Sequence, residues 1–171
     1  MSTKKPLENL LTLHHAAAYQ WARQCCRYQS EWAQDVLQSV YVKVLEGKAK
    51  PSRLEPEGFK SWLFGVIRLT ALEQWRKERD YEPLEPLMQV LKDEEEVQPA
   101  QYYQQMIGRL PERQAQLLTL VFYHGLTVEA AAGVMEIAVG TARTHYARGK
   151  ATLKELIESE EYASTGPRSA H

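Results

Sequence analysis

Residues 126–154 read as two short helices joined by a tight turn, and they limit what the chain can fold into more than any other segment. Thr127 is a natural N-cap for the first helix, and Val139 opens the second. From Arg143 to Lys154 the second helix carries four cations and no acid, whereas a merely solvated face normally mixes charges. A helix-turn-helix places such a helix in the major groove of DNA, where polar groups read bases and cations hold phosphates.

The side chains that we expect to face DNA lie on this second helix. Its first turns come within reach of base edges, and its later cations lie nearer to phosphates. The predicted contacts are Val139, Thr141, Arg143, Thr144, His145, Arg148 and Lys150. The alternative for the isolated pattern is a helical hairpin whose charges are only solvated.

A further helix is expected just before the motif. Leu110-Pro111-Glu112 is typical of a helix start, and Gly125 is a plausible stop. Apolar residues at helical spacing predict one buried stripe, formed by Leu117, Leu118, Val121 and Phe122. The inner contacts of the DNA-facing helix are expected from Tyr146, Leu153, Leu156 and Ile157.

Hydrophobic periodicity over the whole chain predicts an all-α fold, with two small helical domains joined by a flexible linker. The first domain is expected over residues 7–79, with helices at 7–27, 31–45 and 59–77. The second is expected over residues 100–158. Between them, residues 80–99 form an acidic, proline-containing linker, and residues 159–171 are expected to be a disordered tail.

Charge is segregated along the chain of 171 residues, although the net charge is only −1. Lys60–Arg79 holds five cations and two acids, whereas Asp80–Glu96 holds seven acids and one cation. This pattern indicates two DNA-facing basic segments around a solvated linker. The adjacent Cys25 and Cys26 suit reduced thiols, and no spacing suits zinc, so no metal or cofactor is expected. The sequence contains no apolar run long enough to span a membrane and no signal-peptide core, which favours a cytoplasmic protein.

Two blocks of the sequence resemble the extracytoplasmic-function sigma factors, which are small specificity subunits of bacterial RNA polymerase. Ala33–Asp80, containing AQDVLQSVYVKVLEG and FKSWLFGVIRLTALEQWRKERD, is similar to region 2 of that family. Leu110–Leu156, beginning LPERQAQLLTLVFYHGLTVEAAAG, is similar to region 4. The resemblance implies core RNA polymerase and promoter DNA as partners, and an anti-sigma factor as a candidate third partner.

The family resemblance also implies roles for residues of the first block. The helix that carries Asp35 and Gln38 on one face, with Lys43 near, would dock on the polymerase. The following loop and helix would bind the −10 element as a single strand, which requires a cationic groove and pockets or stacking surfaces for bases. The implied −10 contacts are Lys48, Lys50, Arg53, Arg68, Thr70, Glu73, Gln74, Arg76 and Lys77.

The chain departs from the family pattern at four positions. Thr70 stands where Asn is frequent, so the base preference at one −10 position is open, and Glu73 stands where Asp is frequent. Glu136 stands where the turn of the motif usually has Gly, which predicts a left-handed backbone at a cost of about 1 kcal/mol or a reshaped turn. Ala138 replaces a Ser, so the second helix lacks its N-cap, typically worth about 1 kcal/mol.

Two other classes of function are weighed against a sigma factor. A DNA-binding regulator that works without polymerase would need only the second block, and would not need the face formed by Asp35 and Gln38. An enzyme would need a nucleophile with its base, metal-ligand spacing or a phosphate loop, and the sequence shows none of these. We therefore expect a protein that binds and directs polymerase without chemistry of its own.

Overall fold

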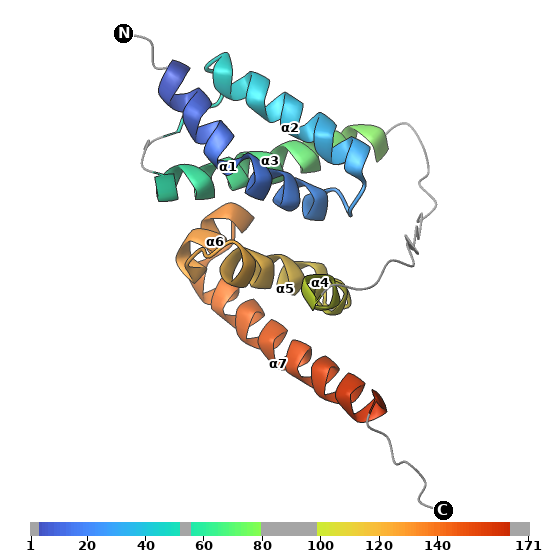
Figure 1. Ribbon diagram of the computed structural model, residues 1–171. Helices are drawn as coiled ribbons and strands as arrows, with labels where there is room; N and C mark the ends of the chain where they lie inside the picture. Colours follow the sequence, from blue (N-terminus) through green and yellow to red (C-terminus); the bar gives the residue numbers. More distant parts are fainter. Residues whose placement is uncertain (1–3, 52–55, 80–98, 165–171) are drawn as a thin grey trace, which may run out of the picture. The chain divides into compact units, whose positions relative to one another are not determined.

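The computed structural model describes residues 4–51, 56–79 and 99–164 (Figure 1). All regular structure within these ranges is helical, as predicted. Arg53, residues 80–98 of the predicted linker and residues 165–171 of the predicted tail lie outside the described residues. The chain divides into two units, and each is considered by itself below.

The first unit is a bundle of three helices, α1 (Lys4–Cys25), α2 (Ser30–Leu45) and α3 (Pro56–Arg79), each of which packs against the other two. Apolar residues at helical spacing on all three helices turn toward one centre. The largest side chains that this unit buries completely are Trp21, Val36, Val40, Val44, Phe59, Leu63, Phe64 and Ile67.

Trp21 is the largest residue of this core, and it joins α1 to α3 in two ways. Its indole Nε1 donates a hydrogen bond of 3.0 Å to the backbone carbonyl of Phe64. Its ring stacks on the ring of Phe64 with the centroids 5.8 Å apart. Because the indole N–H is hydrogen-bonded, burying it costs little free energy. The large apolar surface of Trp21 can therefore stabilise the core.

The sequence predicts that the first helix ends at Arg27, but α1 ends at Cys25. The turn between α1 and α2 explains the difference. Arg27 and Tyr28 have φ angles of 53° and 62°, so both adopt the left-handed backbone that L-residues rarely occupy. The guanidinium of Arg27 lies 5.5 Å from the ring centre of Trp75 on α3, which holds this turn against the bundle. Beside it, burial raises the pKa of the Cys26 thiol to about 12, so this thiol stays protonated and unreactive.

The C-terminal half contains α4 (Pro99–Gly108), α5 (Glu112–Leu118), the π-helical turn η1 (Thr119–Tyr123), α6 (Val128–Met135) and α7 (Val139–Ser164). Helices α4, α5 and α7 share a small core centred on Leu110, Ala115 and Leu118. The side chains of Tyr146, Leu153 and Leu156 pack against it from α7, which confirms three of the four inner contacts predicted for that helix.

The predicted apolar stripe before the motif is wrong at Phe122. Leu117 and Leu118 are fully buried, but 64% of Phe122 is exposed, and Leu120 takes the buried position instead. The reason is the π-helical turn η1, because wider winding rotates every later side chain relative to an α-helix. Phe122 instead lies beside Tyr146 of α7, with ring centroids 5.8 Å apart.

Helix α7 continues to Ser164, whereas the sequence predicts a disordered tail from Ser159 onward. A tertiary contact accompanies the added turn, since Arg109 Nη1 donates to Glu160 Oε1 at 2.6 Å. This ion pair ties the end of α7 to the segment between α4 and α5. The pair lies beyond the reach of a local pattern, because 51 residues separate its members.

Gly149 lies on the side of α7 that packs closely against α5. It is buried, although its neighbours Arg148 and Lys150 are exposed. A Cβ atom at this position would stand 3.2 Å from Leu118 Cδ1 and 3.3 Å from Gln114 Cβ, both on α5. The absence of a side chain at residue 149 therefore allows the basic helix to pack against its support.

Candidate nucleic-acid interface

The helix-turn-helix is built from α6, α7 and the turn between them. Thr127 Oγ1 accepts a hydrogen bond of 3.1 Å from the backbone N–H of Ala130, which confirms Thr127 as the N-cap of α6. Gly125 has a φ of 70°, which confirms it as the left-handed stop that precedes the motif. The local signals of the sequence therefore set the start of α6 correctly.

The turn of the motif is strained at Glu136. Its φ of 54° shows that, of the two outcomes predicted for a non-Gly residue, the chain adopts the left-handed backbone. The turn is closed by two backbone bonds, from Glu136 to Gly133 at 3.3 Å and from Ile137 to Ala132 at 3.1 Å. Two residues later, Ala138 precedes α7 with no side-chain oxygen to cap it, so α7 begins without that support.

Glu136→Gly is expected to stabilise the motif by about 1 kcal/mol, because glycine adopts a positive φ without steric cost. Slower hydrogen exchange at the amides of Ile137 and Ala142 would report the gain. Glu136→Ala is the matched control, since it removes the same carboxylate but keeps the Cβ. Equal stabilisation by both variants would show that the loss of charge, and not of strain, is responsible.

The predicted DNA-facing residues of α7 lie along its first four turns. Thr141, Arg143, Thr144, Arg148 and Lys150 are exposed, whereas Val139 and His145 are partly buried. The hydroxyl of Thr144 donates to the Gly140 carbonyl at 3.1 Å, which leaves its oxygen able to accept. The Nδ1 atom of His145 is buried and has no hydrogen-bond partner among the described residues, and Lys150 Nζ lies 4.5 Å from the ring centre of Tyr146.

Arg143 is held in place by Glu129 of α6. Its Nη2 donates to Glu129 Oε1 at 3.0 Å, and both side chains are more than half exposed. A hydrogen bond from the backbone N–H of Glu129 itself, and then the bond from Arg143, lower the pKa of this carboxyl, so the pair is ionised at neutral pH. The sequence places Glu129 in the first turn of a helix but does not indicate this contact, because the two residues lie on different helices.

The predicted −10 contacts fall into two groups. Arg76, Lys77 and Glu73 on α3 are exposed and Arg68 is partly exposed. Glu78 is exposed as well, so this surface of α3 carries three cations and two acids. After α2, Lys48 and Lys50 are also exposed. Lys48 Nζ lies 2.9 Å from Glu46 Oε2, and this hydrogen bond raises the pKa of the lysine.

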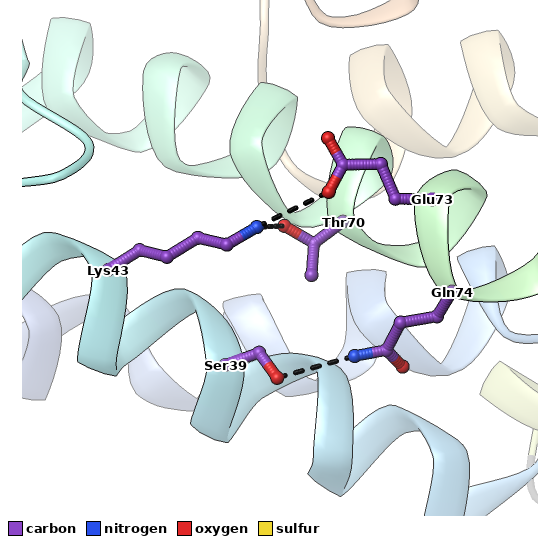
Figure 2. A network of polar contacts seen from close by, with 5 residues as sticks. All are labelled: Ser39, Lys43, Thr70, Glu73 and Gln74. Atoms are coloured by element: carbon purple, nitrogen blue, oxygen red, sulfur yellow. Dashed lines mark hydrogen bonds and ion pairs between the residues drawn. The ribbon is translucent and has the colours of Figure 1, made fainter. Parts of the chain in front are cut away.

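A side chain that contacts DNA directly must be exposed, but Thr70 and Gln74 both face the neighbouring helix α2 (Figure 2). Thr70 is only 3% exposed, and its Oγ1 accepts a hydrogen bond of 3.4 Å from Lys43. Gln74 faces α2, where its Oε1 accepts from Trp32 Nε1 at 3.1 Å and its Nε2 donates to Ser39 Oγ at 3.3 Å. Both amide ends of Gln74 are therefore used to join α3 to α2.

Two faces of α2 are distinct in the structure. Asp35 and Gln38 are exposed, and the stripe continues at the same three- and four-residue spacing through Val42 and Leu45, which are 51% and 38% exposed. Lys43 is not on this stripe, because at 100° per residue it lies about 80° from Asp35 and about 140° from Gln38. Val42 and Leu45 are not among the residues predicted from the sequence to meet polymerase, although their spacing from Gln38 was a usable signal.

No group of histidine, cysteine or acidic side chains within the described residues is arranged to hold a metal ion. Among the same residues, no helix has the length and apolar character needed to cross a membrane. What the described surface does offer is a set of exposed cations on α3 and α7 and an exposed mixed stripe on α2.

Comparison with known protein families assigns both units. Residues 10–81 match the family model of sigma-70 region 2, and residues 100–153 match that of sigma-70 region 4. Among known proteins, the extracytoplasmic-function sigma factor SigM of Mycobacterium tuberculosis is 27% identical over 161 residues, 93% of this chain and 79% of SigM. The sigma factor SigZ of Bacillus subtilis is 25% identical over 128 residues, 72% of each chain.

Solved structures show the same fold. The sigma factor RpoE of Bartonella quintana, crystallised with the anti-sigma factor NepR, superimposes with a TM-score of 0.68 at 21% identity, over 90% of this chain and 98% of RpoE. CnrH, in complex with the cytosolic domain of CnrY, gives 0.60 at 19% identity, over 89% and 87% of the two chains. The chain therefore belongs to the sigma-70 family and, within it, to the extracytoplasmic-function RNA polymerase sigma factors, which direct promoter-specific initiation of transcription.

Proposed function

We propose that this sigma factor binds core RNA polymerase through the α2 stripe and reads promoters with two separate surfaces. The basic surface of α3, with Lys48 and Lys50 after α2, receives the −10 element. The exposed face of α7 receives the −35 element. The protein works as a cytoplasmic binding subunit without chemistry of its own.

The strongest support for the polymerase-binding part is the exposure of the α2 stripe, which comprises Asp35, Gln38, Val42 and Leu45. Two large apolar side chains on a helix surface lose water contact favourably when a partner covers them. Spacing of three and four residues is the pattern with which a helix meets another helix side by side. The carboxylate of Asp35 and the amide of Gln38 then fix the orientation of the bound partner through hydrogen bonds.

The support for DNA binding is the distribution of charge. The first four turns of α7 expose Arg143, Arg148 and Lys150 and no acid, and Glu129 on α6 orients the first of them. Phosphates favour such a surface irrespective of sequence, and polar groups near the start of the helix, such as Thr141 and Thr144, can distinguish bases. An anti-sigma factor, as bound by the similar RpoE, is a candidate regulator of this chain as well.

The test is run-off transcription with core RNA polymerase and a library of randomised promoters. We expect the wild-type chain to select templates that share two sequence elements and to start transcription from them. Asp35→Ala with Gln38→Ala should lower the affinity for core polymerase several-fold, while helical content stays unchanged, because both side chains are exposed and contribute little to folding.

Glu8→Ala with Asn9→Ala is the matched control, since it removes one acid and one amide from an exposed part of α1. It should leave polymerase affinity as in the wild type. DNA binding without any association with core polymerase would instead identify a regulator that acts alone. Equal loss of affinity in the two double variants would remove the α2 stripe from the proposed interface.

A further inference from the structure

A lysine that the family resemblance groups with polymerase contacts lies, in the structure, on the face of α2 that meets α3. Lys43 shares this face with Trp32 and Ser39, and all three bond to side chains of α3. Figure 2 shows the contacts of Lys43 and Ser39. Its Nζ lies 3.4 Å from Thr70 Oγ1 and 3.4 Å from Glu73 Oε2. Lys43, although it lies on α2, therefore borders the surface of α3 that we propose to bind the −10 element.

The contacts of Lys43 are long for an ammonium group. Charge-assisted hydrogen bonds typically measure about 2.7–2.9 Å, and the Lys48–Glu46 and Arg109–Glu160 pairs are 2.9 and 2.6 Å. An ammonium has three donors, and the described residues give Lys43 Nζ only these two partners. The side chain is 37% exposed, so an anion arriving from solvent can reach it.

Thr70 and Glu73 hold this lysine in different ways. Thr70 is buried, and its hydroxyl oxygen accepts a hydrogen bond from the ammonium on the buried side of the lysine. Glu73 is 58% exposed and supplies an anionic partner from the rim. An exposed ion pair is weak, because water and salt screen it, so a better placed anion can displace the carboxylate.

We propose that Lys43 is a ligand for a backbone phosphate of the −10 strand, that Thr70 is its positioning residue, and that Glu73 occupies the phosphate position when no DNA is bound. This inference rests on the proposed function, because it assigns the α3 surface to the −10 element. Exposed Arg76 and Lys77 on the same helix supply the cationic surroundings that a bound strand requires. The departure to Thr70 therefore changes how a cation is held, and the residue itself does not touch a base.

The experiment measures binding of a fluorescent single-stranded DNA pool of random sequence to holoenzyme at several salt concentrations. Lys43→Met should weaken binding several-fold and reduce the salt slope by about 0.7, the value for one phosphate contact to a single strand. Thr70→Val should weaken binding in the same direction, and Thr70→Ser, which keeps the hydroxyl, should restore it. Glu73→Gln should tighten binding, since the competing anion is gone.

The double variant Lys43→Met with Glu73→Gln separates two explanations for a gain at Glu73. If Glu73 acts through Lys43, its replacement has no effect once the lysine is absent. A gain that persists in this background means that Glu73 merely repels DNA, and overturns its assigned role. Lys5→Met, which removes an exposed cation at the start of α1, is the control and should leave binding unchanged.

Two further outcomes overturn the inference. In one, Lys43→Met lowers the affinity for core polymerase but leaves DNA binding by the assembled holoenzyme intact, which returns Lys43 to the polymerase interface. In the other, Lys5→Met weakens DNA binding as much as Lys43→Met. The same titrations on the chain without polymerase test the role of Lys43 even if the proposed function is wrong. The proposed function itself fails if the wild-type chain does not associate with core polymerase.

Discussion

Trp21→Ala is expected to lower the free energy of unfolding of the first unit by about 4 kcal/mol, a large share of the total stability of a small domain. The change removes the largest side chain of the core and deprives the Phe64 carbonyl of its 3.0 Å partner. Urea titration followed by tryptophan fluorescence measures this unit selectively, because the other tryptophans, at positions 32, 62 and 75, also lie in it.

Trp21→Phe divides this loss into its two causes. It keeps an aromatic ring against Phe64 but removes the N–H donor, so the loss should fall to about 1–2 kcal/mol. The amides of α7 should keep their protection from exchange in both variants, since Leu110, Ala115 and Leu118 form a core of their own. A change below about 1 kcal/mol for Trp21→Ala would contradict the central place of this residue in the bundle.

Arg143→Ala should weaken binding to the preferred −35 sequence by about 1–3 kcal/mol and relax the preference at one base pair. The guanidinium is exposed near the start of α7 and Glu129 holds it, so its donors are preorganised. Lys150→Ala should weaken binding to all sequences alike and reduce the salt slope by about one, because this cation lies later on the helix. Holoenzyme titrations across several salt concentrations and −35 sequences measure both quantities.

Arg143→Lys is the matched variant for base reading. It keeps the positive charge but loses the planar pair of donors, so affinity for random DNA should be retained while the base preference is lost. The opposite pattern, in which Arg143→Ala lowers affinity uniformly and Lys150→Ala changes base preference, would mean that α7 lies in the groove in another orientation.

Much of the fold follows from local signals in the sequence. Helical periodicity predicts the helices, and Thr127 is correctly predicted as the N-cap of α6. A residue other than glycine at position 136 leaves two outcomes open, and the chain adopts the left-handed backbone rather than a reshaped turn. These features depend on neighbours along the chain. The exposure of Phe122 does not follow in this way, because a π-helical turn depends on how η1 packs and changes the register without a sequence marker.

In the candidate sites too, some features follow from the local sequence and others depend on tertiary packing. Exposure of Asp35, Gln38 and the α7 cations agrees with their helical spacing. Thr70 and Gln74 continue the helical spacing of the buried residues Leu63 and Ile67, so the inward direction of both side chains was a usable signal. Their hydrogen-bond partners on α2 depend on tertiary packing, which no local pattern encodes. Lys43 lies near Asp35 and Gln38 in the sequence, but only its tertiary contacts reveal that it faces α3.

The close packing at Gly149 has a consequence for mutational surveys of α7, which we propose to bind the −35 element. Positions 147, 148, 150 and 151 are exposed and should accept many substitutions, with losses only where a side chain touches DNA. Position 149 should reject large side chains, because they would push α7 away from Leu118 and Gln114. A screen scored by promoter activity alone would rank this glycine among the DNA contacts, although its requirement is mechanical. Pairing the screen with a measure of protein abundance would separate residues that read the promoter from the one that supports their helix.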